Sequence, residues 1–163
     1  MTKGVEAYES VSSGRSGKLT DAKTYAKLVA EKTKVNGIYS DGIKPSQILK
    51  NELHEAGVPY PPYGFASHHI VPVQHPRAKE ARDILKSYGI ELNSAANGVY
   101  LPYETNEFVG DTVLHIGNHY NKYIDVVTEK LNEVVEFGGT KEDIVNSLNE
   151  IRAGLLDGSI TLN

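Results

Sequence analysis

Four of the six histidines in this 163-residue chain fall into two pairs whose spacing suits metal chemistry. His68 and His69 are adjacent in a segment with strand character, so their side chains would point to opposite faces and do different jobs. His115 and His119 are four residues apart, a spacing that on a helix places both imidazoles on one face. Together, His68, His115 and His119 would supply three nitrogen ligands and leave one position open, as catalytic metal sites do.

Each pair also has an ordinary interpretation. Adjacent histidines arise by chance, and a His-x-x-x-His pair on a surface helix usually faces solvent. Gly117 lies between His115 and His119 and weakens a helix there, so the helix begins either near Val113 or only at Asn118. In the second case the position of His115 depends on a turn rather than on helical spacing.

Hydrophobic periodicity and turn residues predict the elements that must position these histidines. We expect helices over about 19–36, 46–57, 78–88, 113 or 118 to 137, and 141–156, and short strands over 65–72 and 99–102. A loop over 103–111 separates the second strand from the long helix. Together, these predicted elements make a mostly helical α+β protein with a strand–strand–helix unit in the middle of the chain.

Composition is typical of a globular protein and excludes several kinds of site. The chain has no cysteine, which excludes disulfides, thiolate nucleophiles and cysteine-ligated clusters. We expect neither a membrane span nor a signal peptide, because no apolar run is long enough. A Ser/Gly-rich stretch favours a flexible arm or linker over 1–18, followed by a single domain over 19–163. A net charge of −4 argues against a nucleic-acid coat protein, but not against an enzyme that engages a phosphodiester through a metal.

Four segments, in order along the chain, resemble one nuclease family. They are Ser67-His68-His69-Ile70-Val71-Pro72, Tyr88-Gly89-Ile90, Asn97-Gly98-Val99-Tyr100-Leu101-Pro102 and Leu114-His115-Ile116-Gly117-Asn118-His119-Tyr120-Asn121-Lys122-Tyr123. They are similar to the AHH group of the HNH/endonuclease VII nucleases, found as toxin domains in bacterial polymorphic toxin systems, and the histidine positions are also similar to colicin-type DNases. The resemblance implies a ββα-metal (His-Me) finger over about 65–130 with flanking N- and C-terminal helices. Ser67 stands where the family has its first alanine.

The resemblance also implies a role for each matched residue. His68 matches the first metal ligand, and His69 matches the general base that activates the attacking water. Asn97 matches the asparagine that braces the finger and orients that base. His115 and His119 match the paired histidine ligands. Because the spacing from Asn97 to His115 is longer than in colicin-type members, His115 is either a ligand or a contact to the phosphate.

These residue types suit phosphodiester hydrolysis. A divalent ion offsets the negative charge that develops at the phosphate. A neutral imidazole titrates near pH 6.5 and can accept a proton from water. We expect one divalent ion, with zinc favoured by the all-imidazole ligands and Mg, Mn or Ni as alternatives. His75, Arg77 and Lys122 lie near these segments in the sequence and are weaker candidates for contacts to the substrate phosphate.

The sequence thus predicts a metal-dependent endonuclease that hydrolyses DNA with little sequence specificity. The family resemblance implies an antibacterial toxin that is delivered by a larger carrier or secretion protein into the cytoplasm of a target cell and neutralised by a cognate immunity protein. Two alternatives stay open. One is an RNase that uses the same site, and the other is a catalytically inactive, metal-stabilised module that binds a partner protein.

Overall fold

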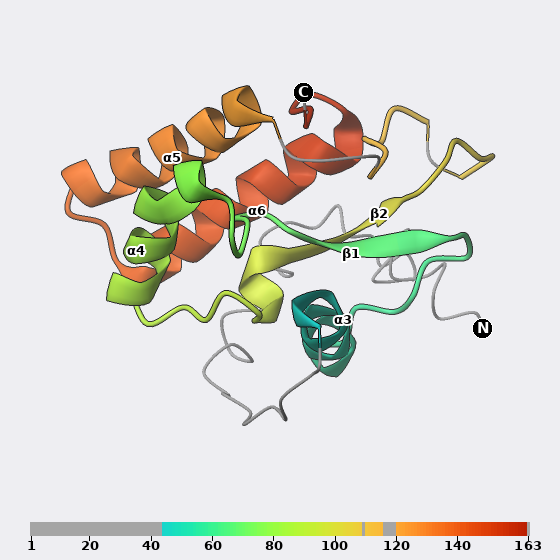
Figure 1. The fold of residues 1–163 in the computed structure, drawn as a ribbon, viewed down its shortest axis with the longest axis horizontal. Helices are drawn as coiled ribbons and strands as arrows, with labels where there is room; N and C mark the ends of the chain where they lie inside the picture. The colour runs from blue at the N-terminus through green and yellow to red at the C-terminus, as the bar shows by residue number, and fades with distance from the viewer. Residues whose placement is uncertain (1–43, 109, 116–119, 163) are drawn as a thin grey trace.

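The computed structural model describes residues 44–108, 110–115 and 120–162, which form a mostly helical α+β fold (Figure 1). In chain order the elements are α3 (Pro45–Glu55), β1 (Phe65–His69), the 3-10 turn η1 (Pro76–Ala78), α4 (Lys79–Ser87), the 3-10 turn η2 (Ala95–Asn97), β2 (Gly98–Pro102), α5 (Asn121–Glu136) and α6 (Lys141–Asp157). The expected arm over 1–18 and the expected helix over 19–36 lie outside the described residues. Within the described ranges, no helix has the length and apolar character that crossing a membrane requires.

The two strands form a small antiparallel sheet that carries the histidine pair at one end. The register runs from Phe65 opposite Pro102 to His69 opposite Gly98. Helix α3 packs on one side of the strands, whereas on the other side α5 packs against both α4 and α6 (Figure 1). The strand–strand–helix unit predicted from the sequence is therefore present, with α4 inserted between its strands.

Helix α3 sits directly on the start of β2. Its buried stripe includes Ile48, Leu49 and Leu53, as the apolar spacing predicts. A Cβ atom built on Gly98 would lie 2.6 Å from Leu49 Cδ1, closer than real side chains approach. The glycine at position 98 is thus required for the close contact between the helix and the sheet.

The start of α5 differs from both predicted starts. The helix begins at Asn121, after Tyr120, whose backbone is extended. His115 lies before the helix, and its backbone N–H donates to the carbonyl oxygen of Pro102 at 2.8 Å. Of the two alternatives left open, the structure therefore supports the one in which the position of His115 does not depend on helical spacing, because this hydrogen bond holds the segment against the end of β2. Tyr120, expected on the apolar stripe, is 54% exposed.

Helix α6 is stabilised by a capping box at its N-terminus and by a buried arginine further along. Thr140 and Asp143 form the predicted capping box at its N-terminus. Further along, the buried Arg152 donates from Nε to the carbonyl oxygen of Gly98 at 2.9 Å and from a terminal nitrogen to that of Ala96 at 2.8 Å. Sequence analysis did not single out Arg152, although a charged residue on an apolar helix face was a signal. The guanidinium ties α6 to the junction between η2 and β2.

We expect Arg152→Met to lower the free energy of unfolding by roughly 2–4 kcal/mol, because methionine fills the space but leaves buried carbonyl groups without their donors. Urea denaturation followed by circular dichroism measures this loss. Glu150→Gln, an exposed change on the same helix, is the control. A loss below about 0.5 kcal/mol for Arg152→Met would show that these hydrogen bonds contribute little to stability and would contradict the prediction.

Candidate active site

The two histidines at the end of β1 are both buried and face different neighbours. His68 is 1% exposed and His69 is 9% exposed. The ring of His68 lies against His115 and Tyr123, whereas His69 contacts Asn93. This division follows from the alternation of side chains along a strand. One strand therefore supplies two chemically separate histidines.

His68 and His115 form the core of the candidate metal site. Their ring centroids lie 5.3 Å apart with an edge-to-face angle of 69°. The backbone hydrogen bond from His115 to Pro102 brings the second ring to the first, so the pair is assembled by the end of the sheet. Burial lowers the pKa of His115, which favours the neutral imidazole that a metal requires.

Tyr123, a buried residue of α5, contacts the His68 ring. Its hydroxyl donates to the carbonyl oxygen of Ile70 at 2.8 Å and lies 3.3 Å from Nε2 of His68. Because the single hydroxyl proton is used on Ile70, the tyrosine oxygen accepts from the His68 Nε2–H. Burial raises the pKa of Tyr123, so the hydroxyl keeps its proton. Sequence analysis gave Tyr123 no role of its own, although a buried tyrosine usually finds a partner for its hydroxyl.

The donor set fits a divalent metal. Two imidazoles lie side by side, and one is fixed through its second ring nitrogen, as ligating histidines commonly are. Among the described residues, no group of three His, Asp or Glu side chains is arranged to hold an ion. His119, the third predicted ligand, lies outside the described residues.

The side chain in contact with the His69 ring is Asn93, a residue for which the sequence predicted no role in the site. Nε2 of His69 lies 2.8 Å from Oδ1 of Asn93, in the loop before η2. Burial lowers the pKa of His69, and the hydrogen bond to Asn93 offsets part of that effect. The imidazole is therefore neutral near pH 7 and able to accept a proton.

Asn97 braces the backbone. Its Oδ1 accepts from the N–H of Val71 at 2.8 Å, and its Nδ2 donates to the carbonyl oxygens of Val71 at 3.1 Å and Leu92 at 3.0 Å. The bracing part of the predicted role is thus present. The side chain in contact with His69 is Asn93, which sequence reasoning missed because asparagine in a turn is ordinary.

Of the three weaker candidates for a phosphate contact, two are hydrogen-bonded to neighbouring residues and the third, Lys122, is exposed. His75 accepts the N–H of Arg77 on Nδ1 at 3.2 Å and so caps η1. Arg77 makes two hydrogen bonds to the carboxylate of Asp125, at 2.7 and 2.9 Å, which raise the pKa of Arg77 and lower that of Asp125. Lys122 is exposed in the first turn of α5. Of the three, Lys122 is best suited to meet an anion.

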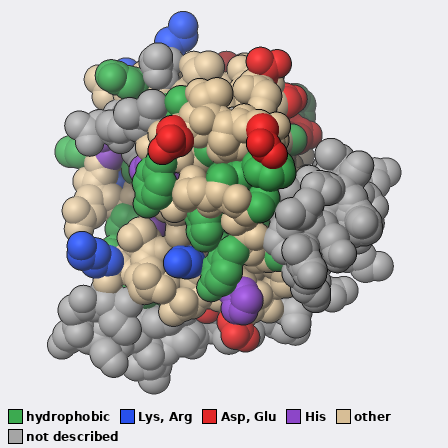
Figure 2. Space-filling view, turned by 90° about the vertical axis from the view of Figure 1, so that its right-hand side faces the viewer, with side chains coloured by type: hydrophobic (Ala, Val, Ile, Leu, Met, Phe, Trp, Pro, Cys, Tyr) green, Lys and Arg blue, Asp and Glu red, His purple; other side chains and the backbone are tan. Residues whose placement is uncertain are grey.

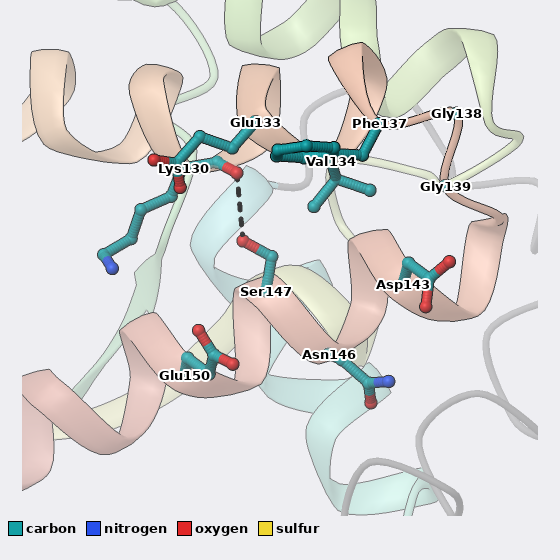
Figure 3. Close-up of a pocket in the computed structure, with 10 residues that line it drawn as sticks. All are labelled: Lys130, Glu133, Val134, Phe137, Gly138, Gly139, Asp143, Asn146, Ser147 and Glu150. Carbon is teal, nitrogen blue, oxygen red and sulfur yellow. Dashed lines mark hydrogen bonds between the residues drawn. The ribbon is translucent and has the colours of Figure 1, made fainter.

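A surface hollow of about 650 Å³ lies between α5 and α6, and its lining includes no histidine (Figure 3). Glu133, Asp143 and Glu150 face it with Lys130, and the hydroxyl of Ser147 donates to the Lys130 carbonyl oxygen at 3.4 Å. Three carboxylates against one ammonium group disfavour an anionic ligand there. The hollow is therefore an acidic surface feature that does not include the candidate site.

Figure 2 shows the charged and apolar side chains on one face of the molecule. Hydrophobic side chains are exposed there between scattered positive and negative groups. The described residues form no continuous basic surface on this face. Binding of a polyanion to it would depend on a few local contacts rather than on a broad positive field.

We expect Tyr123→Phe to destabilise the metal-free protein by about 1–3 kcal/mol, because the ring still fits while the Ile70 carbonyl and His68 lose their buried partner. Affinity for a divalent ion should fall roughly 10-fold or more, because His68 is no longer held. Urea denaturation and isothermal titration with Zn²⁺ measure the two effects. Tyr120→Phe, which removes an exposed hydroxyl one residue before α5, should change neither, and equal behaviour of the two variants would contradict this assignment.

Comparison with known proteins gives one family. A nuclease family of the HNH/ENDO VII superfamily with conserved AHH matches residues 49–155. This range is wider than the 65–130 expected from the motifs, and it takes in most of α3 and α6, both of which pack against β2. No curated protein and no solved structure matches the chain. The chain belongs to this AHH family of HNH/ENDO VII nucleases, enzymes that act on nucleic acid and generally use a divalent metal.

Proposed function

We propose that the chain is a metal-dependent endonuclease that cuts DNA with little sequence preference. The observation that carries this proposal is the arrangement at the end of β1. The His68 and His115 rings lie side by side, while His69 is held by Asn93 on the other face of the strand. One member of the candidate metal-binding pair, His68, is therefore the direct sequence neighbour of the candidate proton acceptor, His69.

In this proposal, His68, His115 and His119 hold one divalent ion. The part given to His119 rests on the family resemblance, because that residue lies outside the described ranges. When bound, the ion supplies Lewis-acid stabilisation of the charge that develops on the phosphate and leaving oxygens. Imidazole donors favour zinc, and Mg, Mn and Ni are the alternatives to test.

His69 takes the proton of the attacking water. As the water oxygen bonds to phosphorus, an O–H bond of the water breaks and the proton passes to the imidazole, while the bond from phosphorus to the leaving oxygen breaks. A base in this role contributes roughly 10²- to 10⁴-fold to the rate. Asn97 supports this step through the backbone, because it fixes the residues that follow β1.

Lys122 and His115 are the proposed contacts to the substrate phosphate, with His115 in this role only if it does not bind the metal. Lys122 is exposed and directly precedes Tyr123, the residue whose hydroxyl lies 3.3 Å from Nε2 of His68. Arg77 and His75 rank lower because each is already engaged with a neighbour. The choice of DNA over RNA rests on the resemblance to colicin-type DNases.

Plasmid nicking tests the activity. The wild-type protein should convert supercoiled plasmid to nicked and linear forms with added Mg²⁺, Mn²⁺, Ni²⁺ or Zn²⁺ and should stop in EDTA. His69→Ala should cut at least about 100-fold more slowly. Glu150→Gln, in the hollow between α5 and α6, should retain the wild-type rate.

Three results would change the proposal. Cutting by His69→Ala at the wild-type rate would remove the assigned base. Degradation of single-stranded or structured RNA without plasmid nicking would make the substrate RNA. If neither nucleic acid is cut with any of these ions, and chelation lowers the melting temperature sharply, the chain is a metal-stabilised binding module.

We also propose that the nuclease acts as a toxin, delivered by a larger carrier protein into a target cell and neutralised by an immunity protein. This part rests on the resemblance to polymorphic toxin domains. Induced expression in a bacterial cytoplasm should stop growth and fragment the chromosome, whereas His69→Ala should be tolerated. An active enzyme whose expression leaves growth unchanged would contradict the toxin role without affecting the nuclease assignment.

A further inference from the structure

We infer that Asn93 is a positioning residue that fixes the tautomer of His69 and thereby decides which imidazole nitrogen can accept a proton. This inference rests on the proposed function, in which His69 is the base. Asn93 lies 24 residues from His69 in the sequence, at the end of the loop between α4 and η2. Its side-chain amide is a direct polar partner of the His69 ring.

The chemistry of the two groups sets the tautomer. Oδ1 of Asn93 lies 2.8 Å from Nε2 of His69. An amide oxygen can only accept a hydrogen bond, so Nε2 carries the hydrogen. A neutral imidazole has one such hydrogen and one lone pair, which places the lone pair on Nδ1. Nδ1 is therefore the nitrogen that takes the proton from water.

The backbone around Asn93 is fixed on both sides. The carbonyl oxygen of Leu92 accepts from Nδ2 of Asn97 at 3.0 Å. On the other side, the backbone N–H and the hydroxyl of Ser94 both donate to the Glu91 carbonyl oxygen, at 3.0 and 2.7 Å. Asn97 thus acts on His69 at one remove: it holds the residue before Asn93, and Asn93 holds the ring.

Loss of the Asn93 amide should leave the two tautomers of His69 mixed. Only the fraction with the lone pair on Nδ1 would be competent, and the ring would also lose its aim. We expect Asn93→Ala to slow plasmid cutting roughly 10- to 100-fold, less than removal of the base itself, because the imidazole remains. Asn93→Asp should recover much of the rate, because a carboxylate also accepts from Nε2–H.

Nitrogen NMR reads the tautomer directly. Long-range proton–nitrogen correlation on the metal-free full chain, labelled with ¹⁵N-histidine, distinguishes a protonated ring nitrogen from an unprotonated one. The His69 signals are assigned by their disappearance in His69→Gln. Wild type and Asn93→Asp should show the Nε2–H form, and Asn93→Ala should show a mixture or the Nδ1–H form. Asn146→Ala, an exposed asparagine at the α5–α6 hollow, should match wild type in tautomer and rate.

The outcomes separate this inference from the proposed function. An unchanged tautomer in Asn93→Ala, or the Nδ1–H form in Asn93→Asp, would overturn the inference even if the wild-type protein cuts DNA. An Nε2–H form that depends on Asn93 in a protein that cuts no nucleic acid would support the positioning contact and remove the catalytic role of His69. If Asn93→Ala does not fold, the Asn93→Asp spectrum decides.

Discussion

The side-chain amide of Asn97 is the interaction on which the site depends most. Beyond the end of β1 the backbone of Val71 no longer has a strand partner, and the amide replaces that partner for both the N–H and the C=O. Because unpaired buried backbone groups are costly, this substitution allows the chain to leave the sheet within the core. The third bond, to Leu92, draws the opposite loop inwards and brings Asn93 to His69.

The elements that the sequence predicted well are those with local signals. Helix α3 has a proline at its start and a buried apolar stripe, and α6 has its capping box. The start of α5 was missed because a contact remote in sequence decides it. The N–H of His115 bonds to Pro102, thirteen residues earlier, and no periodicity records such a bond. Propensity sets where a helix is favoured, and tertiary contacts set where it begins.

The sequence singled out His68, His69 and His115 as site residues, but not the side chains that contact the first two of them in the fold. Adjacent histidines on a strand correctly indicated two separate environments, and the motif order brought His115 to His68. Helical spacing does not set the position of His115, which lies before α5 and bonds through its backbone to Pro102. Asn93 and Tyr123 contact histidines 24 and 55 residues away, so their roles arise only from the folded arrangement.

The five-residue ladder between β1 and β2 has a consequence for how the two histidines keep distinct chemistries. A slip of one residue would rotate every β1 side chain by half a turn, and His68 and His69 would exchange surroundings. Short two-stranded sheets resist such slips weakly on their own. Here Leu49 of α3 occupies the space beside Gly98, the residue opposite His69. A shift of β2 that moved a larger residue into this position would clash with Leu49, so the contact favours the observed register. An aliphatic side chain on a helix remote in the sequence thereby helps to keep His68 beside Tyr123 and His69 beside Asn93.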